Sequence, residues 1–168
     1  KDKATPIEDG APAIVWLSYN VHGNETSSSE AAMLTIYSLL HPANAKSKEW
    51  LKNSVVIIAP CINPDGRDRY VNWFNSVVGQ NSNPSWAARE HREPWPGGRT
   101  NHYNFDLNRD WLSAVHVESQ NRLKWFHKWK PNILTDHHEQ GSNATFFFQP
   151  GVPSRVNPGN FYALPQSP

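Results

Sequence analysis

The sequence contains a single cysteine, Cys61, which excludes a framework of internal disulfide bonds and a metal site built from several thiolates. An excess of either charge is also missing, because 16 Lys and Arg residues stand against 15 Asp and Glu residues, a formal net charge of +1. This balance excludes the strongly basic surface that nucleic-acid-binding proteins present. We therefore expect no nucleic-acid partner.

Long hydrophobic runs are absent as well. The longest, at residues 14–17 and 55–59, fall far short of the roughly 18 residues that a membrane span requires. The first six residues are polar and do not contain the apolar core of a signal peptide. We expect no membrane span, and a location that is either cytoplasmic or, slightly favoured, secreted or periplasmic after removal of a leader.

The 168 residues include 8 Trp, 5 Tyr and 7 Phe, which favours a folded protein, and the length suits one domain over residues 1–168. Two short apolar runs, at 13–19 and 54–59, are typical of buried strands. Between them, apolar residues recur at helical spacing after Ser27, and Ser27 and Glu30 have the spacing of a capping box. This order predicts a β-α-β unit with parallel strands.

The rest of the chain predicts fewer regular elements. Residues 61–104 show no clear periodicity and are rich in Asn, Pro and Gly, so we predict a long loop, which in a compact domain is usually functional. A second helix is expected at about 113–128, with strands at 132–138 and 145–148. This alternation of strands and helices predicts an α/β fold class.

Candidate metal ligands follow the predicted strands. His22 and Glu25 come directly after the first strand, residues 63–66 (Asn-Pro-Asp-Gly) follow the second, and His138 ends the third. A lone His-x-x-Glu is more often a helix start with a favourable carboxylate. However, the carboxyl ends of parallel strands meet at one sheet edge, where ligands bind. Imidazole and carboxylate are zinc ligands, so the sequence predicts a metal site there.

These segments, together with residues 106–109 (Asp-Leu-Asn-Arg), resemble the zinc carboxypeptidase family in order and topology over about residues 13–150. The resemblance implies a zinc-carboxypeptidase-like fold, with a mixed, partly parallel sheet flanked by helices. It also implies one zinc ion held by two His and one Glu, the ligand set of carboxypeptidase A. Carried over, the ligands are His22, Glu25 and His138. His137 is the alternative third ligand, but strand alternation places it on the opposite face, as a packed or hydrogen-bonded residue.

Further roles follow from the same resemblance. Asp106 corresponds to the carboxylate that orients a zinc-bound imidazole, although a turn or cap residue would look the same. Asn108 and Arg109 correspond to the pair that receives the C-terminal carboxylate of a peptide, which suits a guanidinium fork and a neutral amide donor. Arg99 is the candidate for stabilising the oxyanion. Four other arginines compete for that role: Arg67, Arg69, Arg89 and Arg92.

The general base of the family is a glutamate well downstream of the third ligand. After His138 this sequence has one carboxylate, Glu139, which we interpret as structural. The resemblance therefore implies a catalytic domain that is incomplete on its C-terminal side. We expect it to bind zinc, to have little peptidase activity of its own, and to self-associate through an unpaired sheet edge.

The expected function is zinc-dependent hydrolysis that removes C-terminal residues from peptides. A first alternative is a zinc-dependent deacylase of N-acyl amino acids, similar to succinylglutamate desuccinylase and aspartoacylase, which share a His-Gly-Asn-Glu-Thr start and an Asn-Arg pair. A second is a catalytically inactive module that binds zinc or carbohydrate. The expected partner is accordingly a peptide or a small acyl-amino-acid substrate. Sugar stacking would use tryptophans in or beside the long loop: Trp73, Trp86, Trp95 and Trp111.

Overall fold

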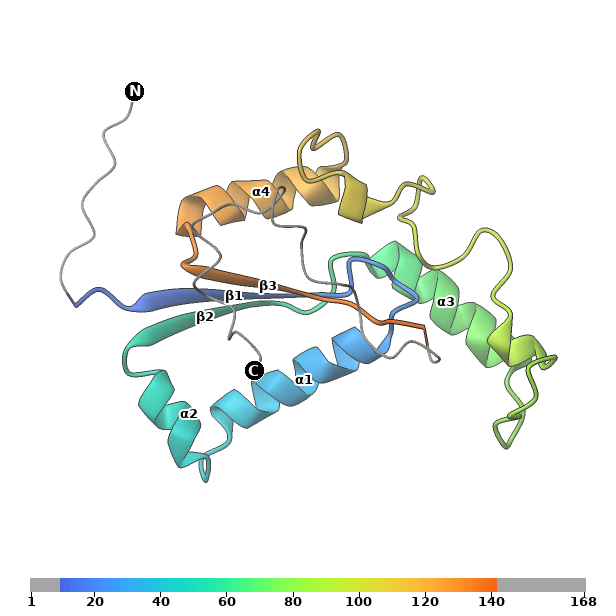
Figure 1. The fold of residues 1–168 in the computed structure, drawn as a ribbon, viewed down its shortest axis with the longest axis horizontal. Coiled ribbons are helices and arrows are strands. Elements are labelled where there is room, and N and C mark those ends of the chain that lie inside the picture. The colour runs from blue at the N-terminus through green and yellow to red at the C-terminus, as the bar shows by residue number, and fades with distance from the viewer. Residues whose placement is uncertain (1–9, 142–168) are drawn as a thin grey trace, which may run out of the picture.

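A three-stranded parallel sheet forms the centre of the protein, whose computed structural model describes residues 10–141 (Figure 1). Strand β1 (Ala13–Tyr19) lies between β2 (Ser54–Ala59) and β3 (Ile133–His137), and pairs in parallel with both. The predicted α/β class and the β-α-β unit are confirmed. The fourth predicted strand, at 145–148, lies outside the described residues.

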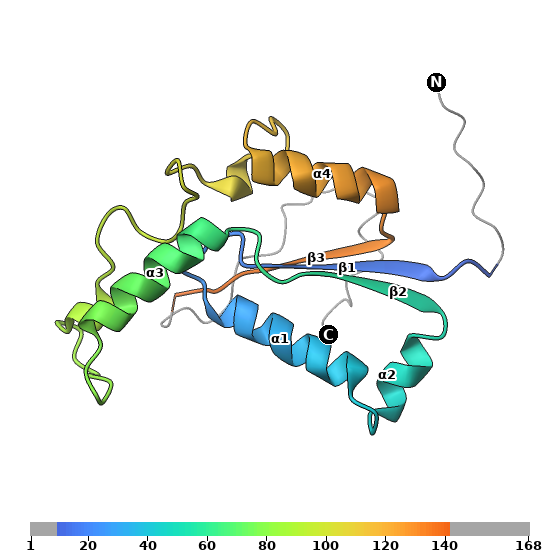
Figure 2. The ribbon, with the colours of Figure 1, turned by 180° about the vertical axis from the view of Figure 1, so that it is seen from behind.

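Helices cover both faces of the sheet. Helix α1 (Ser27–Leu40) and the short α2 (Ala45–Trp50), which we did not predict, lie on one face, and α4 (Val117–Trp129) lies on the other (Figures 1 and 2). Helix α3 (Pro64–Val77) extends beyond the carboxyl ends of the strands. Two single turns of 3₁₀ helix, η1 (Arg89–His91) and η2 (Leu107–Arg109), interrupt the long connection to α4. No helix of the described part is long and apolar enough to cross a membrane.

Helix α3 corrects the prediction of an uninterrupted loop over residues 61–104. The Asn63 side chain accepts a hydrogen bond of 2.9 Å from the Gly66 N–H, and Pro64 occupies the first helical turn, where its missing N–H costs nothing. The Asn-Pro-Asp-Gly segment therefore starts a helix and does not simply turn. Along this helix the rings of Tyr70 and Phe74 stack, and Trp73 contacts both of them at an angle.

The predicted capping box of α1 is wrong. No side-chain hydrogen bond caps the helix from Thr26, and Glu30 instead forms an ion pair of 2.7 Å with Arg67. The N-terminal turn is capped from the end of β3: Glu139 Oε1 accepts hydrogen bonds from the Ser27 N–H (2.8 Å) and the Ser27 hydroxyl (2.6 Å). A carboxylate at a helix N-terminus is favourable whichever segment supplies it.

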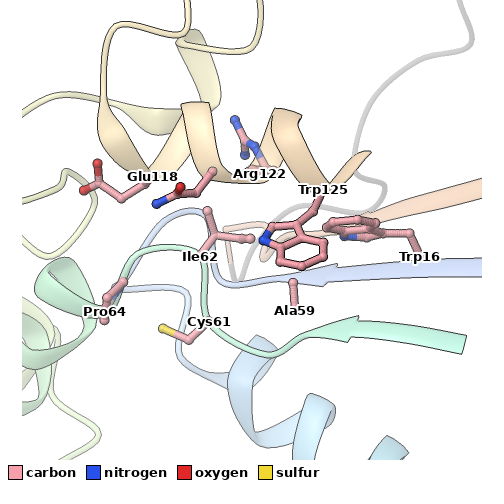
Figure 3. Close-up of a pocket in the computed structure, with 9 residues that line it drawn as sticks. Trp16, Ala59, Cys61, Ile62, Pro64, Glu118, Arg122 and Trp125 are labelled. Atoms are coloured by element: carbon pink, nitrogen blue, oxygen red, sulfur yellow. The ribbon is translucent and has the colours of Figure 1, made fainter. Parts of the chain in front are cut away.

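A cavity of about 310 Å³ lies between α4 and the sheet (Figure 3). Its walls are mostly apolar, and Trp16 of β1 and Trp125 of α4 both line it. None of the candidate metal ligands lines this cavity, so it is separate from the site described below. Its lining residues are Trp16, Ala59, Cys61, Ile62, Pro64, Glu118, Asn121, Arg122 and Trp125.

Candidate metal centre

The turn between β1 and α1 carries the first two candidate ligands, and Asn20 folds it. Asn20 is fully buried in a left-handed conformation (φ 57°), and its side-chain amide donates to the carbonyls of His22 (2.8 Å) and Glu25 (2.9 Å). Gly23 lies against the start of α3, where a Cβ atom would overlap the backbone of Gly66. The turn therefore needs both an Asn and a Gly to hold His22 and Glu25 together.

His22, Glu25 and His138 form a compact cluster at the carboxyl ends of β1 and β3. Their potential ligand atoms all lie within 4.8 Å of one another. Glu25 faces both imidazoles, with Oε1 2.8 Å from His22 Nδ1 and Oε2 3.0 Å from His138 Nδ1. The His22 side chain is 3% exposed, and those of Glu25 and His138 are 14% exposed. The cluster is thus largely buried, and solvent still reaches Glu25 and His138.

A carboxylate lies behind each imidazole. Asp106 Oδ1 is 3.1 Å from His22 Nε2, and Asp136 Oδ2 is 3.2 Å from His138 Nε2. With a metal ion at each Nδ1, each Nε2 would carry the hydrogen and donate it to the carboxylate behind the ring, because an ionised carboxylate only accepts hydrogen bonds. The two Nδ1 lone pairs and the Glu25 oxygens would then form one set of donor atoms for a cation.

The donor set fits a zinc ion. Zinc takes imidazole nitrogen and carboxylate oxygen at about 2.0–2.2 Å, which places neighbouring tetrahedral ligand atoms roughly 3.3 Å apart. The observed separations of 2.8 and 3.0 Å between Glu25 and the two imidazoles are close to that value. The two carboxylates behind the imidazoles are the usual outer partners of zinc-bound histidines.

The electrostatics of the site keep its carboxylates ionised. Burial by itself raises the pKa of Glu25, but hydrogen bonds from His22, the Glu139 N–H and His138 outweigh it, and the pKa lies below its usual value. Burial likewise raises the pKa of Asp106, and the Asn108 N–H and the positive charges nearby more than compensate for it. Both groups are therefore negative at neutral pH, as a cation site requires.

Arg99 lies beside this cluster. Its Nε and Nη2 are 3.2 and 3.0 Å from Asp106 Oδ2, and its Nη1 is 3.4 Å from His22 Nδ1. Three of the competing arginines are bonded elsewhere: Arg67 to Glu30 and the Thr26 carbonyl, Arg69 to the Gly97 and Asn101 carbonyls, and Arg92 to the Trp86 carbonyl.

Asn108 and Arg109 lie in the 3₁₀ turn that follows Asp106. Asp106 caps this turn by accepting a 2.9 Å hydrogen bond from the Asn108 N–H through the same Oδ1 that contacts His22. The Asn108 side-chain nitrogen is 3.5 Å from His138 Nε2, at the border of the cluster. Arg109 is exposed and donates to the Asn108 carbonyl at 3.3 Å.

His137 lies outside the cluster. Its Nδ1 is 2.9 Å from the Ser18 carbonyl, and its ring stacks on Tyr19 at a centroid distance of 4.0 Å. The structure thus places the two adjacent histidines in different surroundings, His138 against Glu25 and His137 against β1.

Three residues support the site although the sequence predicted no role for them: Asn20, Asp136 and Glu93. Strand alternation offered a signal for Asp136, because residues two apart share a face and Asp136 precedes His138 by two. Glu93 offered none. Its carboxylate accepts a 2.8 Å hydrogen bond from Asn24 and another from the Gly98 N–H, which ties the ligand turn to the segment that carries Arg99.

Comparisons with known proteins agree with this geometry. A family model described as zinc carboxypeptidase matches residues 3–146. Carboxypeptidase 2 of Trichophyton rubrum is 27% identical over 133 residues, which are 79% of this chain and 19% of that protein. A probable carboxypeptidase 2 of Arthroderma benhamiae is 26% identical, over 79% of this chain and 20% of that protein. This chain thus spans about a fifth of the length of these relatives.

A solved structure supports the same fold. A crystal structure from Shewanella denitrificans, of a protein assigned as a carboxypeptidase A, superposes with a TM-score of 0.56 at 20% identity. The match covers 79% of this chain and 29% of that one.

Proposed function

This chain belongs to the zinc carboxypeptidase family, and on that premise we propose that it supplies the zinc-binding part of a metallocarboxypeptidase. His22, Glu25 and His138 would hold one zinc ion. The observation that supports this most directly is the convergence of both Nδ1 atoms on the two oxygens of Glu25, with a carboxylate behind each ring.

Catalysis combines the metal with charged groups of this chain. A zinc ion bound there supplies Lewis-acid polarisation of the scissile carbonyl and lowers the pKa of a water molecule. Arg99, whose Nη1 reaches 3.9 Å from Glu25 Oε1, stabilises the negative charge that develops on the carbonyl oxygen. Asp106 holds Arg99 through one oxygen and His22 through the other, so it positions a metal ligand and the arginine together.

Asn108 and Arg109 receive the C-terminal carboxylate of the substrate. Arg109 is exposed, and among the described residues it makes one hydrogen bond, from Nη1 to the Asn108 carbonyl, so most of its guanidinium is available to a carboxylate. Asn108 adds a neutral donor within the same turn, close to His138. Holding the substrate terminus fixes which peptide bond lies at the metal.

We do not propose Glu139 as the general base that accepts a proton from the attacking water. Its carboxylate accepts two hydrogen bonds from Ser27 at the start of α1, and its backbone N–H donates to Glu25. These contacts support the structural interpretation of Glu139. Since the chain spans about a fifth of its relatives, peptide hydrolysis is proposed for the whole protein to which this segment contributes the metal site.

A substrate comparison tests this function against the deacylase alternative. We expect the whole protein to hydrolyse N-blocked dipeptides with a free C-terminus and to leave N-acetyl and N-succinyl amino acids intact. A chelator should abolish the hydrolysis and added zinc should restore it. Turnover of the acyl amino acids alone would instead establish the deacylase.

The same assay tests Arg109. Lysine keeps the charge but cannot form the bidentate contact, so Arg109→Lys should lower kcat/KM for peptides with a free C-terminus about 10- to 100-fold. Peptides with an amidated C-terminus should lose far less. Arg92→Lys, at another exposed loop arginine, serves as the matched control. An equal loss on both substrates would remove Arg109 from carboxylate recognition.

A further inference from the structure

Only one of the two carboxylate oxygens of Asp136 contacts the metal-ligand cluster. Its Oδ2 contacts His138 Nε2 at 3.2 Å, whereas its Oδ1 is buried and makes no hydrogen bond with any described residue. A buried carboxylate oxygen without a partner is costly unless a positive charge lies nearby. The position of Asp136 in the sheet shows where such a charge can come from.

Asp136 faces α4. In the parallel register, Ser18 of β1 pairs with Asp136 and Trp16 pairs with Leu134, so these side chains share one face of the sheet. Trp16 lines the cavity beneath α4, which identifies that face (Figure 3). Asp136 therefore lies on the side of the sheet that α4 covers.

Helix α4 carries a buried arginine on the same side. Arg122 is 5% exposed and lines the same cavity as Trp16. Two contacts hold its guanidinium: Nη2 donates to the Leu107 carbonyl at 3.3 Å, and the group lies 3.6 Å above the centre of the Trp111 ring. Its Nε and Nη1 are buried and have no hydrogen-bond partner among the described residues.

Two carboxylates act on this arginine. Burial lowers the pKa of Arg122, and the negative charges of Asp136 and then Asp110 raise it in opposition. Asp110 is already satisfied, because its two oxygens accept hydrogen bonds from the backbone N–H groups of Val115 and His116. Asp136 Oδ1 is not satisfied, so the charge of Arg122 complements Asp136.

We propose that Arg122 is a positioning residue of the metal centre: its buried positive charge holds the Asp136 carboxylate against His138 Nε2. His138 then presents Nδ1 to Glu25 and to the metal. The inference rests on the proposed zinc site, because it concerns the orientation of one of its ligands. Arg122 would thus support Asp136, which in turn supports His138, from the interface between α4 and the sheet.

A double-mutant cycle on zinc affinity tests this role in the 168-residue chain. The variants are Arg122→Met, Asp136→Asn and the double variant, with zinc dissociation constants measured by competition with a chromophoric chelator. Each single variant should weaken zinc binding about 10-fold or more, as loss of outer partners does. In the Asp136→Asn background, Arg122→Met should add less than about threefold, because coupled residues are not additive.

Controls separate this role from a general loss of structure. Lys128→Met removes an exposed cation of the same helix that lies over the Trp125 ring, and should leave zinc affinity unchanged. If Arg122→Met loses its near-UV signal, Arg122→Gln, which keeps a donor for Leu107, takes its place in the cycle. Unchanged zinc affinity in the Arg122 variant would overturn the inference. It would also be overturned if the two single variants weakened zinc binding independently, so that their fold-changes multiplied in the double variant. Absence of zinc binding by the wild-type chain would instead overturn the proposed function.

Discussion

Replacement of His138 by alanine is expected to weaken zinc binding more than about 100-fold, whereas His137→Ala should change it less than about threefold. His138 Nδ1 lies 3.0 Å from Glu25, and its ring is held from behind by Asp136. His137 instead contacts the Ser18 carbonyl and stacks on Tyr19. Removing a ligand costs more than the 10- to 100-fold typical of residues behind a ligand.

Zinc content after dialysis and the dissociation constant both measure this difference. The two variants are matched, because they remove the same side chain from adjacent positions of one chain. Loss of the Tyr19 stack can lower the stability of His137→Ala, so its thermal unfolding is followed in parallel. A chain that loses zinc with His137→Ala and keeps it with His138→Ala would show that the end of β3 presents the other histidine to the metal.

Replacement of Arg99 by methionine in the whole protein should lower kcat about 10²- to 10³-fold, with a much smaller change in KM. The guanidinium lies beside the cluster, where charge develops on the carbonyl oxygen only as the reaction proceeds. An interaction made in the transition state alone affects kcat and leaves ground-state binding nearly unchanged. Zinc content should stay close to stoichiometric, since Asp106 keeps its contact with His22.

Steady-state kinetics on a peptide with a free C-terminus provides the measurement. Arg92→Met is the matched control, because Arg92 is an exposed arginine of the same long connection and donates to the Trp86 carbonyl. A kcat within about threefold of wild type for Arg99→Met would exclude the proposed role. Loss of zinc together with activity would make Arg99 a support of the metal site instead.

Much of the fold could be predicted because its signals are local. Apolar runs at 13–19 and 54–59 identified two strands, and helical spacing after Ser27 identified the helix between them. Helix α3 was missed because Asn and Pro are favoured both in turns and at helix starts. In the structure the Arg67 N–H donates to the Asn63 carbonyl, and the helix continues from there to Val77.

The start of α4 was misplaced for a related reason. The prediction began the helix at about residue 113, but Asp110 accepts hydrogen bonds from the N–H groups of Val115 and His116 and holds that stretch in a turn. The helix begins at Val117. A side chain that bonds to its own neighbouring backbone competes with the helix, and residue type alone does not show which arrangement prevails.

The sequence by itself determined the positions of the three strands along the chain and the two segments that carry His22, Glu25 and His138. It also determined the resemblance to a zinc enzyme. Those features depend on residue type and spacing over a few positions. Tertiary structure decided which residue each supporting carboxylate contacts. Asp106 reaches His22 across 84 residues, and Glu139 reaches Ser27 across 112. Such contacts depend on how the strands pair and the helices pack, and no short-range pattern encodes that packing.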